Sequence, residues 1–168
     1  EKSTKRIIQM RHPYVDWRRR NSYVLNVEAK GKLVWFFSHS LPSLEVSFDS
    51  KMVLEQLNNF KGKYREVAVC LHMHDINKGL HEFFMNHGVK VVTAGNTSSP
   101  KFVDRLYDIL SQHEFVCSNK FGSELFYAHE LGCTYFTFNT KVKYNGFQES
   151  ANDIKRNAIL DEIERLWA

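Results

Sequence analysis

The sequence predicts an α/β domain built on a mostly parallel β-sheet, and three observations point to that fold class. Apolar runs of strand length recur along the chain, at 33–37, 66–71, 89–93, 115–117 and 133–138. Stretches with a helical spacing of apolar residues separate these runs. The early runs are apolar on both faces, which is typical of central parallel strands covered by helices on both sides. Strands that alternate with helices at such short spacing are the pattern of repeated β-α-β units.

The connecting helices are indicated by capping residues and by apolar side chains three or four positions apart. The first helix begins at Asp49 or Ser50, either of which can cap its free N–H groups, and ends at the Lys-Gly-Lys sequence 61–63. Segments with the same spacing follow the next three strand-length runs, and the last of them closes at Gly132. A polar loop is expected at 139–150, with a closing helix after it.

Numbered along the chain, the predicted strands are expected in the sheet order 3-2-1-4-5. Crossovers between parallel strands are right-handed, so the chain fills one side of the sheet with strands one to three and returns to the other side for strands four and five. Together with the helices, this order gives a Rossmann-like three-layer sandwich with a five-stranded, mostly parallel sheet. In such sheets, ligands bind outside the carboxyl ends of the strands where the winding reverses, here between strands one and four.

The composition excludes several classes of protein. A chain of 168 residues with 43% apolar and 25% charged residues is typical of one globular domain and excludes a disordered or fibrous protein. Its apolar runs are too short to cross a bilayer and no secretory signal pattern opens it, so a soluble, cytoplasmic protein is expected. Its cysteines are odd in number and lack Cys-x-x-Cys spacing, which predicts reduced core thiols at Cys70, Cys117 and Cys133.

The positive charge is concentrated near the start of the chain. Residues 1–20 hold seven basic and two acidic side chains, whereas the whole chain carries a net charge of only +4. We expect residues 1–30 to form a basic head or interdomain segment in front of a domain at 31–168. Such a head can attract nucleic acid, an anionic membrane or a phosphorylated ligand, and a solvated linker is the alternative interpretation.

Two polar loops are expected to flank the point where the winding reverses. One follows the first strand at 38–40, and the other runs from 118 to 123, between the fourth strand and a helix. The free N–H groups at the start of that helix favour an anion such as a phosphate, and a glycine before it lets a ligand approach the backbone. The alternative is a plain turn glycine and an N-cap serine. The candidate binding residues are Ser38, Ser40, Ser118, Asn119, Gly122 and Ser123.

Candidate catalytic residues lie at the ends of the first two strands. His39 can take a proton from an attacking hydroxyl, with Asp75 as its orienting partner. The cluster His72-x-His74-Asp75 also contains metal-ligand types, but alternating residues at a strand end point in opposite directions, and Asp75 is a good helix cap. We therefore expect no metal. The loop at 95–99, which begins with Gly95, either contacts a hydroxylated ligand or only connects two elements.

A longer pattern runs through the same loops. It comprises Ser38-His39-Ser40, His74-Asp75, Val91-Val-Thr-Ala-Gly95 and Ser118-Asn119-x-x-Gly122-Ser123, followed by Tyr127-Ala128-x-x-Leu131-Gly132. With this pattern, the chain from about residue 32 to residue 138 resembles the nucleotide-sugar-binding half of GT-B glycosyltransferases, of the type that assembles bacterial polysaccharides and surface glycans. The resemblance implies that Gly122 and Ser123 hold the donor diphosphate, with Ser118 and Asn119 beside it.

The resemblance further implies a function. The chain would be the donor-binding domain of a glycosyltransferase that transfers a sugar from a nucleotide sugar to a glycan or lipid-linked acceptor, with His39 or Asp75 near the reacting carbon. The nucleotide sugar is then the substrate, and neither a cofactor nor a nucleic-acid partner is expected. Because a GT-B cleft needs two domains, a second domain or partner chain is expected. The basic residues 1–20 would allow peripheral contact with the inner membrane face.

Other functions stay open at this point. UDP-GlcNAc 2-epimerases share the same half-fold, but they and many GT-B enzymes bind the ribose through a Glu in the helix, where this chain has Phe126 and Tyr127. Glu124 or Glu130 would have to replace it. A non-catalytic, flavodoxin-like nucleotide-binding or interaction module is the alternative from another class, and a metal-dependent hydrolase at His72–Asp75 is a more distant one.

Overall fold

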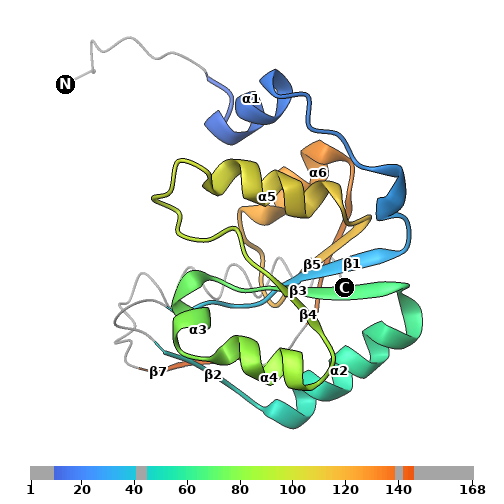
Figure 1. Ribbon diagram of the computed structural model, residues 1–168, viewed down its shortest axis with the longest axis vertical. Helices are drawn as coiled ribbons and strands as arrows, with labels where there is room; N and C mark the ends of the chain where they lie inside the picture. Colours follow the sequence, from blue (N-terminus) through green and yellow to red (C-terminus); the bar gives the residue numbers. More distant parts are fainter. Residues whose placement is uncertain (1–9, 41–44, 139–141, 146–168) are drawn as a thin grey trace, which may run out of the picture.

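A fully parallel five-stranded sheet forms the centre of the protein (Figure 1). The computed structural model describes residues 10–40, 45–138 and 142–145. The strands of the sheet are β1 (Lys32–Phe36), β3 (Glu66–Cys70), β4 (Lys90–Val92), β5 (Phe115–Ser118) and β6 (Thr134–Thr137). Their order is β4-β3-β1-β5-β6, which confirms the expected order 3-2-1-4-5. The strand numbers in the two orders differ because the chain forms a strand that was not expected, β2, between the first two strands of the sheet.

Helices cover both faces of the sheet and complete the three-layer sandwich. One face carries α5 (Phe102–Ser111) and α6 (Glu124–Leu131), and the other carries α2 (Ser50–Lys63), α3 (Met73–Asn77) and α4 (Leu80–Asn86) (Figure 1). Successive residues of β1 point to opposite faces. Val34 therefore packs with the α5 and α6 side chains, whereas Leu33 and Trp35 pack with those of α2 and α4. All three are fully buried.

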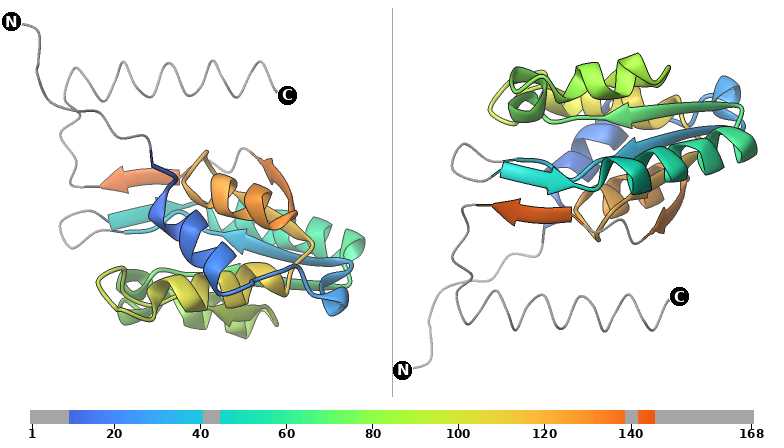
Figure 2. Two further views of the ribbon diagram at one scale, coloured as in Figure 1. Left: turned by 90° about the horizontal axis from the view of Figure 1, so that it is seen from above. Right: turned by 90° about the horizontal axis from the view of Figure 1, so that it is seen from below.

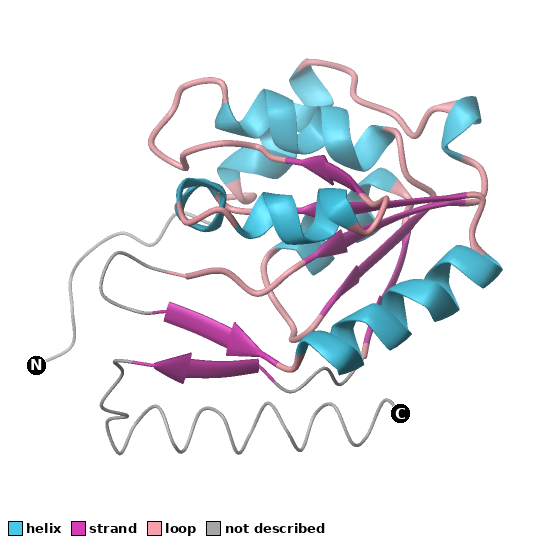
Figure 3. Cartoon of the chain, turned by 60° about the horizontal axis from the view of Figure 1, so that its bottom comes forward, coloured by secondary structure: helices cyan, strands magenta, loops and turns pink. Residues whose placement is uncertain are grey.

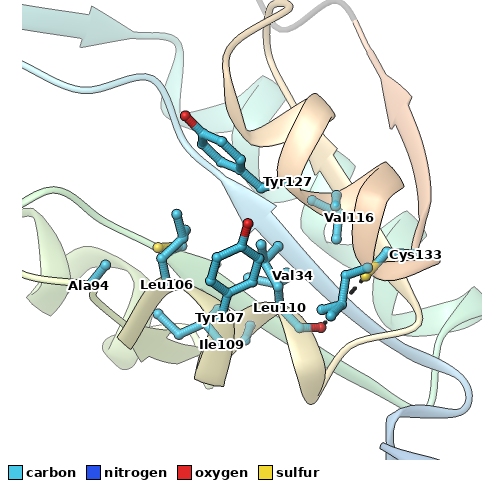
Figure 4. Close-up of a cluster of buried hydrophobic side chains, with 13 residues drawn as sticks. Val34, Ala94, Leu106, Tyr107, Ile109, Leu110, Val116, Tyr127 and Cys133 are labelled. Atoms are coloured by element: carbon cyan, nitrogen blue, oxygen red, sulfur yellow. Dashed lines mark hydrogen bonds between the residues drawn. The ribbon is translucent and has the colours of Figure 1, made fainter. Parts of the chain in front are cut away.

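The core on the α5/α6 face is built around tyrosines as well as aliphatic residues (Figure 4). Tyr107 is fully buried there, and its ring meets that of Tyr127 with centroids 6.3 Å apart. Cys133 lies at the edge of the same cluster and donates its thiol to the Leu110 carbonyl at 3.6 Å. The three cysteines are all buried and free, as expected.

Helix boundaries follow the capping signals in most places. Asp49 caps α2 by accepting hydrogen bonds from the N–H groups of Lys51 and Met52, at 2.9 and 3.3 Å. Gly132 ends α6 in the left-handed region, with φ of 95°. The helical segment after β3 is divided into α3 and α4 because Gly79 adopts a φ of 83° between them. A side chain at that position would strain the backbone, which explains why a glycine separates the two helices.

A small antiparallel sheet of two strands stands apart from the main sheet and was not expected (Figure 3). It pairs β2 (Glu45–Phe48) with β7 (Val142–Asn145), in a register that runs from Glu45 opposite Asn145 to Phe48 opposite Val142. The expectation of a polar loop was wrong for 142–145. The two partners are far apart in the sequence, so neither short segment carries a local hairpin signal. The expected closing helix lies outside the described residues.

The segment before the sheet contains a helix that the sequence did not predict. α1 (Pro13–Arg20) begins after His12, whose Nδ1 accepts the N–H of Tyr14 at 3.2 Å, and a short 3-10 turn, η1 (Val27–Ala29), precedes β1. α1 lies on α5 and α6 (Figure 2). Trp17 Nε1 donates to Asp104 of α5 at 2.7 Å, and Arg19 Nε donates to Glu130 of α6 at 2.8 Å. No helix in the described part of the chain is long and apolar enough to cross a membrane.

Candidate functional site

A cavity of about 500 Å³ opens at the carboxyl ends of β1, β3 and β4, beneath the start of α1. Helices α5 and α6 bound it on the other side. This is the end of the sheet at which ligands bind in open α/β folds, and the volume is within the range of small-molecule sites. Aromatic and imidazole side chains are eight of the seventeen lining residues, and small, apolar and a few polar residues make up the rest: His12, Pro13, Tyr14, Phe36, Phe37, His39, Cys70, Leu71, His72, Ala94, Gly95, Thr97, Phe102, Leu106, Ser123, Glu124 and Tyr127.

One wall of the cavity is a cluster of aromatic rings contributed by three helices and the residue before α1. The rings of Tyr14 and Tyr127 lie 5.2 Å apart between centroids, and those of His12 and Tyr127 lie 5.4 Å apart. Phe102 of α5 is 6.3 Å from Tyr14. Flat rings of this kind can stack on a planar or sugar-like ligand. Sequence reasoning missed this wall because α1, which supplies Tyr14, shows no clear apolar period.

The loop after β1 is fixed by Asp75. Its two carboxylate oxygens accept the backbone N–H of Ser40 at 3.0 and 3.2 Å, and both residues are buried. Ser40 Oγ in turn accepts the N–H of Val46 at 3.1 Å. The ring of His39 has its Nδ1 3.2 Å from the carbonyl of Ser40, so the hydrogen bonds of the described residues do not join His39 to Asp75. Asp75 therefore positions the loop that carries His39 and does not line the cavity.

Three imidazole rings follow one another beside the cavity, and two of them, His39 and His72, line it. His39 and His72 have centroids 5.0 Å apart, and His72 and His74 are 4.9 Å apart. His72 and His74 do not diverge as alternating residues of a strand would, because the chain turns into α3 at once and His72 Nδ1 accepts the N–H of His74 at 3.3 Å. Burial lowers the pKa of His72, and the neighbouring His39 and His74 lower it further. Within the described residues, no three His, Cys, Asp or Glu side chains converge as a metal site.

Hydrogen bonds to the buried side chain of Asn119 fix the loop after β5. Asn119 is buried, and its Oδ1 accepts the indole N–H of Trp35 at 2.9 Å and the backbone N–H of Ser38 at 3.3 Å. It thus ties the two loops expected to flank the reversal point to each other. Ser118 Oγ donates to the carbonyl of Lys120 and lies 2.6 Å from Tyr135 Oη. Neither Ser118 nor Asn119 is part of the cavity lining.

The start of α6 differs from the sequence-based expectation in one respect. The space beside Gly122 is filled by the carboxylate of Glu124, which a Cβ at position 122 would overlap. The N–H groups of Leu125 and Phe126 are bonded to the carbonyls of Gly122 and Ser123, at 3.2 and 3.1 Å. Ser123 stands at the N-cap position of α6 but makes no side-chain capping bond there, and it lines the cavity.

Glu124 is the site residue that sequence reasoning undervalued. It lines the cavity, and Tyr135 Oη lies 3.4 Å from its Oε1. Burial raises its pKa above the ordinary value, although a bond from its own backbone N–H, the hydroxyls of Ser118 and Tyr135, and the charge of His39 act in the opposite direction. An acidic residue in the first turn of a helix is usually a surface group that interacts with the helix dipole. Nothing local in the sequence indicates that this one is half-buried and lines the cavity.

The predicted site residues therefore separate into two groups. His39, Gly95 and Ser123 line the cavity. The remaining six lie around it as supports of the loops or outside its lining: Ser38, Ser40, Asp75, Ser118, Asn119 and Gly122. Gly95 has a φ of 85°, and a Cβ there would lie 2.7 Å from Arg105 Nη1. No known family model, curated protein or solved structure was found to match the chain.

Proposed function

We propose that the chain is the donor-binding domain of a glycosyltransferase, in which a nucleotide sugar occupies the cavity and its sugar passes to a glycan or lipid-linked acceptor. The observation that carries this proposal is the position of the cavity. It opens at the carboxyl ends of the parallel strands β1, β3 and β4, and the first turn of α6 bounds it. Helix α6 follows β5, and the winding of the sheet reverses between β1 and β5. That is where doubly wound folds bind nucleotides.

The residues that line the cavity can contact the base, the sugar and the phosphates of a nucleotide sugar. The rings of Tyr14, Phe102 and Tyr127 offer faces for a base or a sugar, and the hydroxyl of Ser123 offers a hydrogen bond to a phosphate oxygen. His39 lies at the mouth and is the group that would accept a proton from the attacking hydroxyl. Asp75 acts on His39 through the backbone of Ser40 and is a positioning residue in this scheme.

The test is a thermal-shift panel with UDP-, GDP-, CMP- and ADP-sugars, because a ligand that binds the native state raises the melting temperature. Isothermal titration calorimetry with the responding sugar nucleotide then compares Tyr14→Ala with the wild type. The loss of one aromatic contact, about 0.5–1.5 kcal/mol, should weaken binding by about two- to thirteenfold. Phe126→Ala is the matched control, since Phe126 is an exposed aromatic residue on α6 outside the cavity.

Two results would contradict the proposal. One is the absence of any response to the four sugar nucleotides. The other is a response that Tyr14→Ala leaves unchanged, because the ligand would then bind elsewhere.

A second candidate is a nucleotide-binding module without turnover of its own. The hydrogen bonds of His39 and Asp75, the two residues expected to be catalytic, favour this candidate. Both oxygens of Asp75 accept the N–H of Ser40, and His39 has no carboxylate partner in the described contacts. Assays of donor hydrolysis and sugar transfer separate the two candidates. Binding without either reaction, also after addition of the expected second domain, would favour the module.

A further inference from the structure

A row of three polar contacts runs behind the first turn of α6. Ser118 Oγ contacts the carbonyl oxygen of Lys120, Ser118 Oγ lies 2.6 Å from Tyr135 Oη, and Tyr135 Oη lies 3.4 Å from Glu124 Oε1. Ser118 is buried and Tyr135 is half-buried, so water does not readily replace these partners. The row begins at a carbonyl, which only accepts, and ends at a carboxyl group in the cavity lining.

The protons available to this row decide the state of Glu124. Each hydroxyl has one proton to donate. If Ser118 donates to the Lys120 carbonyl, Tyr135 must donate to Ser118, and no proton remains for the contact between Tyr135 and an ionised Glu124. Two acceptors would then face each other. A protonated Glu124 supplies the missing proton, and every contact becomes a hydrogen bond in one direction, from Glu124 through Tyr135 and Ser118 to the carbonyl.

We propose that Glu124 is held as a neutral carboxylic acid in the free cavity, and that anionic ligands of the phosphate type bind to this protonated form. The proposal rests on the proposed function for the phosphate part of the ligand. An ionised carboxylate in the cavity lining would repel a diphosphate, whereas the neutral acid does not. Ligand binding and protonation of Glu124 are therefore coupled, and affinity for the anion falls once Glu124 ionises.

The net effect of the surroundings on Glu124 favours a neutral acid. Burial is the largest influence on its pKa and raises it, and this outweighs the opposing effects of its own backbone N–H, of the Ser118 and Tyr135 hydroxyls and of the charge of His39. The titratable groups that face it are His39 after β1, Cys70 at the end of β3, Tyr135 of β6 and Tyr127 on its own helix. Burial raises the pKa of Cys70 to about 12 and raises those of both tyrosines, so these three groups are uncharged at neutral pH. Of the facing groups, His39 is the one that can carry a compensating positive charge.

The first measurement concerns the free protein and needs no ligand. Carbon-13 NMR of protein labelled at the glutamate carboxyl carbons follows the ionisation of Glu124, whose resonance is assigned by its loss in Glu124→Gln. The Glu124 resonance should keep the chemical shift of a protonated carboxyl group well above the ordinary pKa of glutamate, about 4.3. A resonance that reports an ionised Glu124 from mildly acidic pH upward would overturn the proposal.

The second measurement tests the coupling, with inorganic pyrophosphate as the probe. Its affinity is measured by calorimetry over a pH series for the wild type and for Glu124→Gln, whose neutral amide can still donate to Tyr135. Both proteins share the titration of the histidines and of pyrophosphate, so the ratio of their affinities isolates Glu124. The wild type should lose affinity relative to the variant by up to about tenfold per pH unit above the Glu124 pKa.

The outcomes separate this inference from the proposed function. A ratio that is constant over the pH series would overturn the coupling, and so would a failure of pyrophosphate to bind either protein at any pH. Neither result would affect a nucleotide sugar that binds in the thermal-shift panel. Conversely, a pH-dependent ratio without any response to sugar nucleotides would support an anion site coupled to Glu124 and contradict the glycosyltransferase proposal.

Discussion

Asp75 has two buried oxygens that both accept the backbone N–H of Ser40, and this geometry explains its place in the protein. The bonds cross from the start of α3 to the loop after β1, and they hold that loop beside the cavity. A hydrogen bond to an ionised acceptor is shorter and stronger than one between neutral groups. Asp75 therefore contributes to the cavity by fixing the backbone of the loop after β1.

Replacement of Asp75 should reveal this role in stability. Asp75→Ala leaves the Ser40 N–H without its partner in a buried place, which should lower the free energy of unfolding by about 1.5–3 kcal/mol. Urea denaturation measures the change. Asp75→Asn is the matched control, because its amide oxygen still accepts one hydrogen bond and the loss should be smaller. Equal stability of Asp75→Ala and the wild type would show that the loop does not depend on this carboxylate.

Asn119 has a similar role on the other side of the reversal point. Its Oδ1 accepts from both Trp35 and Ser38, so one amide oxygen fixes a core indole and the exit of β1. The sequence marks Asn119 as a polar residue at a strand end, which is correct. Whether such a residue faces the ligand or the core depends on the turn of the loop, and here it faces the core.

The turn from α5 into β5 contains a buried histidine. His113 Nδ1 lies 2.7 Å from the carbonyl of Ile109, whereas its Nε2 has no hydrogen-bond partner in the described part of the chain. Burial lowers the pKa of His113 below its ordinary value of 6.5, against smaller opposing contributions from the Ile109 carbonyl and Glu66. A histidine at a helix end is usually exposed, but His113 is buried.

This burial predicts a pH-dependent stability. The unfolded chain protonates His113 at a higher pH than the native protein does, so the unfolded state binds more protons. The stabilising contribution is complete above the ordinary pKa of 6.5 and is lost as the pH falls from there towards the lower native pKa. The slope is at most about 1.4 kcal/mol per pH unit for one group.

Urea denaturation over a pH series measures this effect, and the difference between wild type and His113→Gln isolates His113 from His72, whose pKa is also lowered. The variant keeps a donor for the Ile109 carbonyl but does not titrate. It should lose less stability on acidification than the wild type. Parallel pH profiles for the two proteins would contradict the prediction.

Helix α1 becomes part of the cavity wall only because it is attached to α5 and α6. Trp17 and Arg19 attach it to α5 and α6, and Tyr14 then becomes part of the cavity wall. The ion pair between Arg19 and Glu130 is partly exposed, and such pairs contribute little to stability. Aromatic packing of Tyr14 against Phe102 and Tyr127 is therefore the larger contribution to holding α1 in place.

Across the described residues of the molecule, two cores are separated by the main sheet. Leu110 of α5 is fully buried on one face, and Leu57 of α2 is almost fully buried on the other. The residues of β1 alternate between the two cores, so neither core can form without the strand that also serves the other. This arrangement predicts that both faces unfold together.

Large-to-small substitutions on each face test that prediction. Leu57→Ala and Leu110→Ala should each lower the free energy of unfolding by about 2–5 kcal/mol, because each creates a cavity. In each variant, circular dichroism and tryptophan fluorescence should report one coincident transition in urea. Met52→Ala on the exposed side of α2 is the control, with a change within about 0.5 kcal/mol. Two separate transitions would show that the faces unfold independently.

The sequence by itself determined the fold class, the five strands of the main sheet and their order. It also predicted a site at the carboxyl ends of these strands, where the structure has a cavity. Apolar runs, helix caps and the right-handed crossover rule act locally or between consecutive elements, so they can be applied to a sequence. They also brought His39, Gly95 and Ser123 into the predicted site, and these residues do line the cavity.

Only the tertiary structure decided which polar side chains face the cavity and which face the core. The pairing of β2 with β7, the docking of α1 and the position of Glu124 in the cavity lining depend on contacts between segments far apart in the chain. The turn of a loop by a single residue redirects a side chain from ligand to core, as Asn119 shows. Local patterns cannot specify such contacts, because their free energy comes from partners that become neighbours only after the sheet has formed.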